Sequence, residues 1–164
     1  MKEKKSCLFS YFFIILIAHF LSPVPLQADE KLGLSKGQTV YVPAYSHIYS
    51  GNRESPFLLT VTLSIRNIDP KHQVEITVVD YYETQGKRLK KYLDEPRIIN
   101  PLESLRYVIP ESDKSGGSGA NFIVEWKSGK SVNPPIVECI MIGTQTQQGV
   151  SFTSRGRVIV TSDD

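Results

Sequence analysis

Most of the chain beyond residue 38 alternates between apolar and polar side chains with a period of two. The segments 59–66, 74–78 and 121–127 each place apolar residues at every second position. Such alternation buries one face of a β-strand and exposes the other. Segment 136–142 is apolar on both faces, which predicts a central strand. The alternating apolar positions are Leu59, Val61, Leu63, Ile65, Val74, Ile76, Val78, Phe122, Val124, Trp126, Val137, Cys139 and Met141.

Proline, glycine and asparagine clusters separate these runs. The segments 67–70, 85–86, 100–103 and 133–135 have the composition of turns. Asp94-Glu95-Pro96 breaks another run, and because proline removes a ladder donor, we expect that strand at a sheet edge. The expected strands are 39–44, 57–67, 73–82, 88–99, 104–109, 120–127, 134–142 and 150–160.

Seven to eight strands at this spacing predict one all-β domain over residues 39–160. The expected architecture is an antiparallel β-sandwich, immunoglobulin-like in the broad sense of two packed sheets. Residues 29–38 are polar and are expected to form a loose lead-in, whereas residues 161–164 form an acidic tail. No window carries the apolar stripe of an amphipathic helix, and no segment repeats.

The first 28 residues have the layout of a secretory signal peptide. Three lysines lie within the first five residues, and 8–21 is a run of 14 mostly apolar residues. As a helix this run would rise only about 21 Å, which is short of the ~30 Å hydrocarbon core of a bilayer. We expect cleavage after Ala28 and a periplasmic or secreted protein. An uncleaved, anchoring signal is the alternative, because Leu26 is a poor residue three places before a cut.

Removal of this segment changes the charge and the cysteine count. The first 28 residues hold three of the 19 basic and one of the 17 acidic residues, so the remaining 136 carry 16 of each. A balanced charge removes the argument for nucleic acid or an anionic membrane as a partner. Cys139 would be the remaining cysteine, so no intrachain disulfide could form. No membrane span is expected after cleavage.

Three polar loops have an unusual composition. Segment 45–51 is rich in aromatic and hydroxyl side chains, 111–119 in serine and glycine, and 143–149 in amides. Because successive strands of an antiparallel sandwich reverse direction, the connections after the odd-numbered strands lie at one end. These loops and 83–87 are therefore expected together, provided that 88–99 counts as one strand. Loops gathered in this way often form binding sites.

The serine- and glycine-rich loop matches no phosphate or calcium motif. Its glycines at 116–119 lack the spacing and the following helix of a phosphate loop, so a flexible hairpin loop is the default interpretation. Glu111, Asp113 and Ser115 could offer oxygen ligands to calcium. However, Lys114 lies among them, and the spacing of an EF-hand is absent.

The histidines and the cysteine give no strong catalytic pattern. His47 and His72 are too few for a zinc cluster. Cys139 falls inside an apolar strand, where a free cysteine usually acts as a small hydrophobe. Asp80-Tyr81-Tyr82 fits a strand end with partly buried aromatics better than acid catalysis. No cofactor and no metal are therefore expected, and His47 with Asp113 is the pairing that a hydrolase could use.

Three segments also carry a likeness to a known family. Segments 41–49, 110–122 and 143–149 with 151–157 resemble the bacterial family known as domain of unknown function 3124, and the likeness extends over about residues 39–157. The resemblance implies a small exported bacterial protein. It implies no activity, ligand or catalytic residue.

The sequence predicts an exported, non-enzymatic binding domain that uses the loops at one end of a sandwich. Tyrosines offer rigid, amphipathic contact area, and the polar loops argue for a polar ligand, a peptide or an envelope protein rather than an apolar pocket. The alternatives are a purely structural envelope module and a hydrolase that uses His47 and Asp113. The candidate binding residues are Tyr45, His47, Tyr49, Asp113, Lys114, Ser115, Asn121, Gln145, Gln147 and Arg155.

Overall fold

The regular elements in the described part of the chain are all β-strands. The computed structural model describes residues 33–49, 52, 54–144 and 149–162. The predicted signal peptide lies outside these ranges. The strands are β1 (Ser35–Pro43), β2 (His47–Tyr49), β3 (Pro56–Leu58), β4 (Thr60–Arg66), β5 (Val74–Tyr82), β6 (Arg88–Lys91), β7 (Arg97–Ile99), β8 (Ser104–Ile109), β9 (Asn121–Val132), β10 (Ile136–Gly143), β11 (Val150–Arg155) and β12 (Arg157–Thr161).

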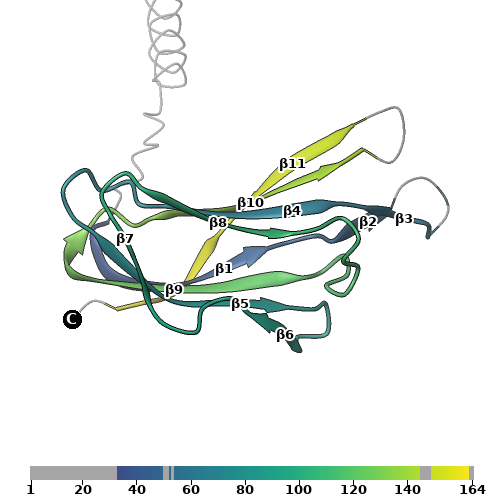
Figure 1. Ribbon diagram of the computed structural model, residues 1–164. Helices are drawn as coiled ribbons and strands as arrows, with labels where there is room; N and C mark the ends of the chain where they lie inside the picture. Colours follow the sequence, from purple (N-terminus) through teal and green to yellow (C-terminus); the bar gives the residue numbers. More distant parts are fainter. Residues whose placement is uncertain (1–32, 50–51, 53, 145–148, 163–164) are drawn as a thin grey trace, which may run out of the picture. The chain divides into compact units, whose positions relative to one another are not determined.

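One layer of the fold is a six-stranded antiparallel sheet in the order β12-β1-β9-β5-β6, with β7 also paired to β5 (Figure 1). The long strand β9 pairs with β1 on one side and with β5 on the other. β6 and β7 both pair with the remaining edge of β5, and both are antiparallel to it. The run 88–99 therefore behaves as one interrupted edge strand, as predicted.

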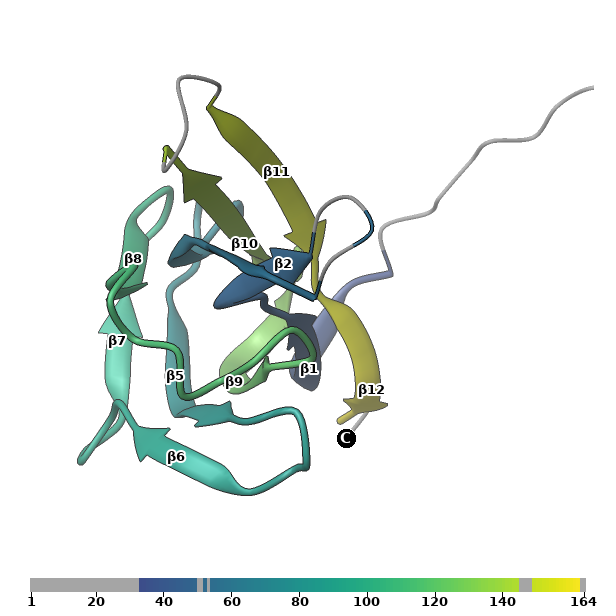
Figure 2. The same ribbon diagram turned by 90° about the vertical axis from the view of Figure 1, so that its right-hand side faces the viewer.

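The second layer is a four-stranded antiparallel sheet in the order β11-β10-β4-β8. Figure 2 shows the two sheets on opposite sides of the interior. β10 lies inside its sheet, which confirms the predicted central position. Its outer face is nevertheless at the surface, since Ile136 and Ile142 are 43% and 47% exposed. An antiparallel sheet needs to be covered on only one face.

The core lies between the two sheets and is built from the alternating positions. All four inward residues of the second predicted strand, from Leu59 to Ile65, are fully buried. The inward residues of β9 and β10 are also buried, among them Trp126 and Cys139. At ~25 cal/mol per Å² of buried apolar surface, such a core is the main stabilising term of a domain without disulfides.

The alternation fails at one strand. Val74, Ile76 and Val78 were expected to share the inner face of β5, but Val78 is only half-buried, and Val79 and Tyr81 are buried instead. The register of β5 against β9 shifts between Ile76 and Val78. A β-bulge adds one residue and so moves every later side chain to the other face.

Several strand boundaries differ from the expected ones. β1 begins at Ser35 instead of residue 39, because residues 35–38 pair with β9 and β12. Part of the expected lead-in is therefore sheet. β9 extends to Val132, and the runs 57–67 and 150–160 each divide into two strands, β3 with β4 and β11 with β12.

The strand order differs from that of an immunoglobulin domain. There the first strand lies beside the second, and the seventh beside the sixth. Here β1 pairs with β9, the sixth expected strand, and β10, the seventh, pairs with β4. The two-sheet antiparallel sandwich is confirmed, with its own order of strands.

All described residues belong to one compact unit. Within the same ranges, no helix is long and apolar enough to cross a membrane.

Candidate functional site

Three connections meet at one end of the sandwich, and we name residues 44–49, 83–87 and 110–120 the loop end. The Ser46 N–H donates to the Gly117 carbonyl over 3.1 Å, and the Thr84 N–H donates to the Gly116 carbonyl over 2.9 Å. These contacts confirm that the first two predicted loops and 83–87 lie together (Figure 1).

The third predicted loop begins beside β3. A Cβ built on Gly143 would lie 2.3 Å from Cε1 of Phe57, so the last residue of β10 is packed against that strand. Gln145 and Gln147 lie outside the described residues. The structure therefore describes the amide-rich loop only at its two ends, residues 143–144 and 149.

The hydroxyl groups of Ser46 and Thr84 connect the segments of the loop end by hydrogen bonds. Ser46 Oγ donates to the Gly117 carbonyl over 3.2 Å and accepts from the Gly117 N–H over 2.9 Å. Thr84 Oγ1 donates to the Gly116 carbonyl and accepts from the Gly119 N–H, each over 3.0 Å. Ser46 is fully buried. The side chains thus satisfy loop backbone groups that no sheet would pair.

The glycine-rich segment is closely packed, which corrects its default interpretation as a flexible hairpin loop. A Cβ on Gly116 would lie 1.8 Å from Oη of Tyr81 and 2.8 Å from Cβ of Ala120. Gly117 has a φ of 81°, a conformation that side chains other than glycine rarely adopt. Glycine is required at both positions, at the first for space and at the second for backbone geometry.

The buried Tyr81 lies beneath this segment, and the partly buried Tyr92 packs nearby against Phe122. Tyr81 is 2% exposed, and its ring lies 4.9 Å from that of Phe122. Burial, and to a smaller extent the charge of Asp113, raises the pKa of Tyr81 and of Tyr92. Both phenols are therefore protonated at neutral pH, so they offer no nucleophile to the site.

The three aromatic candidates of the first loop pack in pairs. The Tyr45 ring meets that of Phe152 edge-on at 5.7 Å. The His47 ring meets that of Tyr49 at 5.2 Å, and His47 Nε2 lies 3.2 Å from the Tyr49 hydroxyl. Tyr49 is 53% exposed. These pairs present an ordered aromatic surface that is partly open to solvent.

Asp113, Lys114 and Ser115 form a tight turn. Asp113 Oδ1 accepts from the Ser115 N–H over 2.9 Å and from the Ser115 hydroxyl over 2.6 Å. The Lys114 side chain is exposed. The aspartate thus shapes the backbone, and the lysine supplies the charge at the surface.

The remaining two candidates lie on strands. Asn121 begins β9 and lies in register with Pro43 and Tyr82, at the loop end. Arg155 ends β11 and lies opposite Glu138 of β10. The residue before it, Ser154, donates its hydroxyl hydrogen to the carbonyl of Pro43, so Arg155 follows a contact at the border of the loop end.

The geometry gives no catalytic pairing of His47 with Asp113. His47 bonds to Tyr49 and Asp113 to Ser115, and within the described ranges no hydrogen bond joins the two. Cys139 is fully buried, and burial raises the pKa of its thiol to about 12. The described residues contain no group of three metal-ligating side chains.

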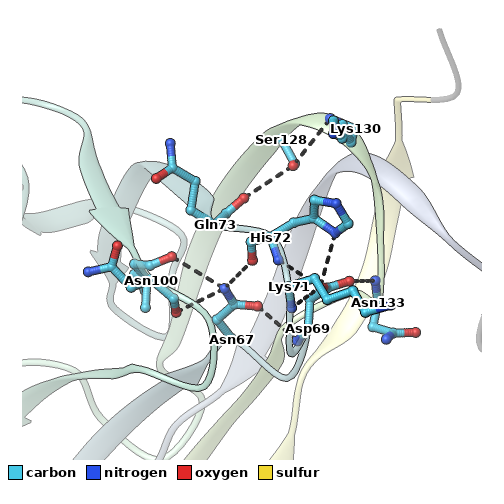
Figure 3. Close-up of polar contacts among 10 residues, drawn as sticks. Asn67, Asp69, Lys71, His72, Gln73, Asn100, Ser128, Lys130 and Asn133 are labelled. Atoms are coloured by element: carbon cyan, nitrogen blue, oxygen red, sulfur yellow. Dashed lines mark hydrogen bonds and ion pairs between the residues drawn. The ribbon is translucent and has the colours of Figure 1, made fainter.

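A second polar cluster occupies the opposite end of the sandwich, where β4 ends at Arg66 beside Ser104, and Figure 3 shows its contacts. Asn67 Nδ2 donates to the carbonyls of His72 and Asn100 over 2.8 and 3.0 Å. Asp69 Oδ1 accepts from the backbone N–H groups of Lys71 and His72, each over 2.9 Å. Its Oδ2 accepts from the Asn133 N–H over 3.2 Å. We name Asn67, Asp69, His72, Asn100 and Asn133 the turn cluster.

The carboxylate of Asp69 organises this cluster. The backbone N–H of Lys71 is the largest cause that lowers its pKa from 3.8 to about 2, and burial opposes the shift. The group is therefore ionised at neutral pH and can only accept hydrogen bonds. His72 Nδ1, 3.1 Å from Asp69 Oδ1, must then carry the hydrogen. The sequence predicted a turn here but not this network.

Two adjoining hollows lie beside the turn cluster and share Gln73, Ser128 and Gly129. The first is about 290 Å³ and is also lined by Glu75, Ile98 and Lys127. The second, about 340 Å³, we name the basic hollow. It is lined by Lys71, His72, Gln73, Pro101, Ser128, Gly129 and Lys130.

Comparison with known proteins places the chain in a family. A family model described as "Protein of unknown function (DUF3124)" matches residues 37–159. The chain belongs to this family. The family resemblance noted in the sequence is thus confirmed. No curated protein matches the chain.

One solved structure is similar in outline. The crystal structure of Thermotoga maritima 1070 is 14% identical, with a TM-score of 0.46, and the match covers 76% of this chain and 97% of that one. The likeness is too distant to carry an argument about function.

Proposed function

We propose that the chain is an exported, non-enzymatic binding domain that recognises a polar ligand, a peptide or an envelope protein through its loop end. The observation that carries the proposal is the hydrogen bonding of Ser46 and Thr84 to the glycine-rich segment. These bonds hold segments distant in sequence as one surface. A surface ordered before binding loses less conformational entropy when a partner docks.

The side chains on this surface suit recognition. Tyr49 combines an exposed aromatic body with a hydroxyl, and His47 packs against it. Such side chains contribute contact area with few rotatable bonds, and the turn with Lys114 adds a charge at the rim. The mixture favours a partner with both polar and aromatic or aliphatic groups, such as a peptide segment.

A binding role is favoured over hydrolysis by the local partners of the two candidate catalytic residues. A general base must reach the proton that it removes. His47 is held by Tyr49 and Asp113 by Ser115, so each side chain supports the shape of its own loop. Export is supported by the signal-like layout of the first 28 residues.

Capture from the bacterial envelope tests the proposal. The purified full chain, immobilised, is exposed to solubilised envelope proteins and peptides, beside Tyr49→Ala and a matched control, Val160→Ala. Val160 is 55% exposed, close to the 53% of Tyr49, and lies on β12. Circular dichroism verifies that both variants remain folded.

The proposal predicts a retained species that Tyr49→Ala loses and Val160→Ala keeps. Capture that is unchanged by Tyr49→Ala, or no specific capture at all, would instead support a purely structural envelope module. Hydrolytic activity that is abolished by His47→Ala and also by Asp113→Asn would instead support a hydrolase that uses these two residues.

A further inference from the structure

One side of the basic hollow is formed by a segment of β9 that departs from regular strand pairing. Gly37 of β1 pairs with Lys127 of β9, yet the next pair is Ser35 with Val132. Residues 128–131 therefore stand opposite the single residue Lys36 and project from the sheet. Bulges of this kind redirect side chains and are common beside binding sites.

The projecting segment is fixed to the neighbouring turn. Ser128 Oγ donates to the Gln73 carbonyl over 3.2 Å (Figure 3). The hollow of about 340 Å³ lies among this segment, the turn 71–73 and Pro101. Three separate stretches of chain thus line it, and a hydrogen bond joins two of them, the projecting segment and the turn.

The hollow carries uncompensated positive charge. Lys71 and Lys130 line it, both are exposed, and within the described ranges neither ammonium group forms an ion pair. The nearest acid of the turn cluster, Asp69, already accepts four hydrogen bonds from the protein.

The acid in the adjoining hollow is also occupied. Glu75 Oε2 lies 3.3 Å from Nζ of Lys127, so its charge is balanced locally. The basic hollow therefore offers the ammonium groups of its two lysines, the Ser128 hydroxyl and the imidazole ring of His72, which Asp69 holds. An anion with several acceptor oxygens would complement it.

We propose that the basic hollow binds a phosphate group, with Lys71 and Lys130 as its charged contacts. Asp69 holds the His72 ring at the rim, and the projecting segment of β9 places Lys130 on the same hollow as Lys71. The volume accommodates a phosphate together with part of the molecule that bears it. This site lies at the end of the sandwich opposite the loop end, and its existence is independent of the proposed function.

Titration of the full chain with inorganic phosphate at constant ionic strength tests this site. Backbone amide signals followed by heteronuclear NMR should shift and saturate at Lys71 and over 128–130. Lys71→Gln and Lys130→Gln should each weaken binding about tenfold or more, as expected for loss of a charge-assisted hydrogen bond. Lys91→Gln on β6, which removes an exposed charge elsewhere, should leave it unchanged.

Two further binding experiments, one with a sugar phosphate and one with lipid vesicles, identify the kind of molecule that carries the phosphate. Tighter binding of a sugar phosphate than of inorganic phosphate assigns the site to soluble phosphate esters. Lysine-dependent binding to phosphatidylglycerol vesicles, but not to phosphatidylcholine vesicles, assigns it to a lipid head group. Absence of saturable shifts in every arm, an equal loss in Lys91→Gln, or equal affinity for acetate would overturn the proposal.

Discussion

A single added methyl group at Gly116 should measurably destabilise the domain. The new Cβ would lie 1.8 Å from Tyr81 Oη and 2.7 Å from Cζ, whereas non-bonded heavy atoms are optimally ~3.5–4.0 Å apart. The loop and the ring must therefore separate by more than an ångström. Hydrogen bonds from Thr84 oppose that movement. We expect Gly116→Ala to lower the free energy of unfolding by about 1–3 kcal/mol, the range for an overpacked site.

A double-mutant cycle with Tyr81→Phe locates the strain. Tyr81 Oη is buried and has no hydrogen-bond partner among the described residues, so its removal should be neutral or stabilising. Without Oη the nearest collision is relieved, and Gly116→Ala should cost less in that background, with a coupling of about 0.5–3 kcal/mol.

Urea unfolding followed by fluorescence of the buried Trp126 measures these free energies. Gly129→Ala is the matched control, because a Cβ there meets nothing within 4 Å. If Gly116→Ala and Gly129→Ala had equal stability, or if the Tyr81→Phe background left the loss unchanged, the described packing of the loop end would be wrong.

Three further substitutions test other parts of the structure. Ser46→Ala leaves the Gly117 N–H without its 2.9 Å acceptor and should cost about 1–3 kcal/mol in urea unfolding; a neutral result would contradict the role given to this hydroxyl. Leu102→Gly should stabilise by about 0.5–1 kcal/mol, because Leu102 is 69% exposed and has a φ of 61°; a loss of thermal stability would contradict it. Asp69 has a folded pKa of about 2 against an ordinary 3.8, so its stabilisation is present above pH ~4 and is lost as the pH falls through about 2. The stability advantage of the wild type over Asp69→Asn should therefore shrink in that window, and a constant difference would refute the assigned bonding.

Period-two alternation predicted most of the fold because burial on one face is local information. The inner positions of β4 and β10, including Leu63 and Cys139, followed directly from it. The bulge in β5 was missed, since no glycine or proline marks it between Ile76 and Val78. The bulge moves the later side chains of β5 to the other face. It depends on how β5 pairs with β9, and the sequence of β5 alone carries no information about that pairing.

Strand direction likewise predicted the meeting of the loops. The prediction is confirmed for the described parts of loops 45–51, 83–87 and 111–119, because β6 and β7 use the same edge of β5, so the break at 92–96 did not reverse the chain. For the amide-rich loop, residues 145–148 lie outside the described ranges. The close packing of the glycine-rich segment could not be predicted in this way. It depends on Thr84 and Tyr81, which approach from another strand and its turn.

The turn cluster was missed for a related reason. Asn67 and Asp69 were recognised only as turn formers, because their partners come from separate turns. The Asn67 amide donates to the carbonyl of Asn100, and the Asp69 carboxylate accepts from the N–H of Asn133. Spacing within 67–70 suggests a local turn, but only the folded chain brings these groups together.

Photo-crosslinking inside living bacteria tests the binding role of the loop end most directly. A benzophenone amino acid replaces Tyr49 in the full chain, and the same replacement at Val160 is the control, since both side chains are about half exposed. We predict a discrete crosslinked adduct from position 49 and none from position 160. No adduct at position 49, or the same adducts from both positions, would contradict the proposal that this end of the sandwich contacts a partner.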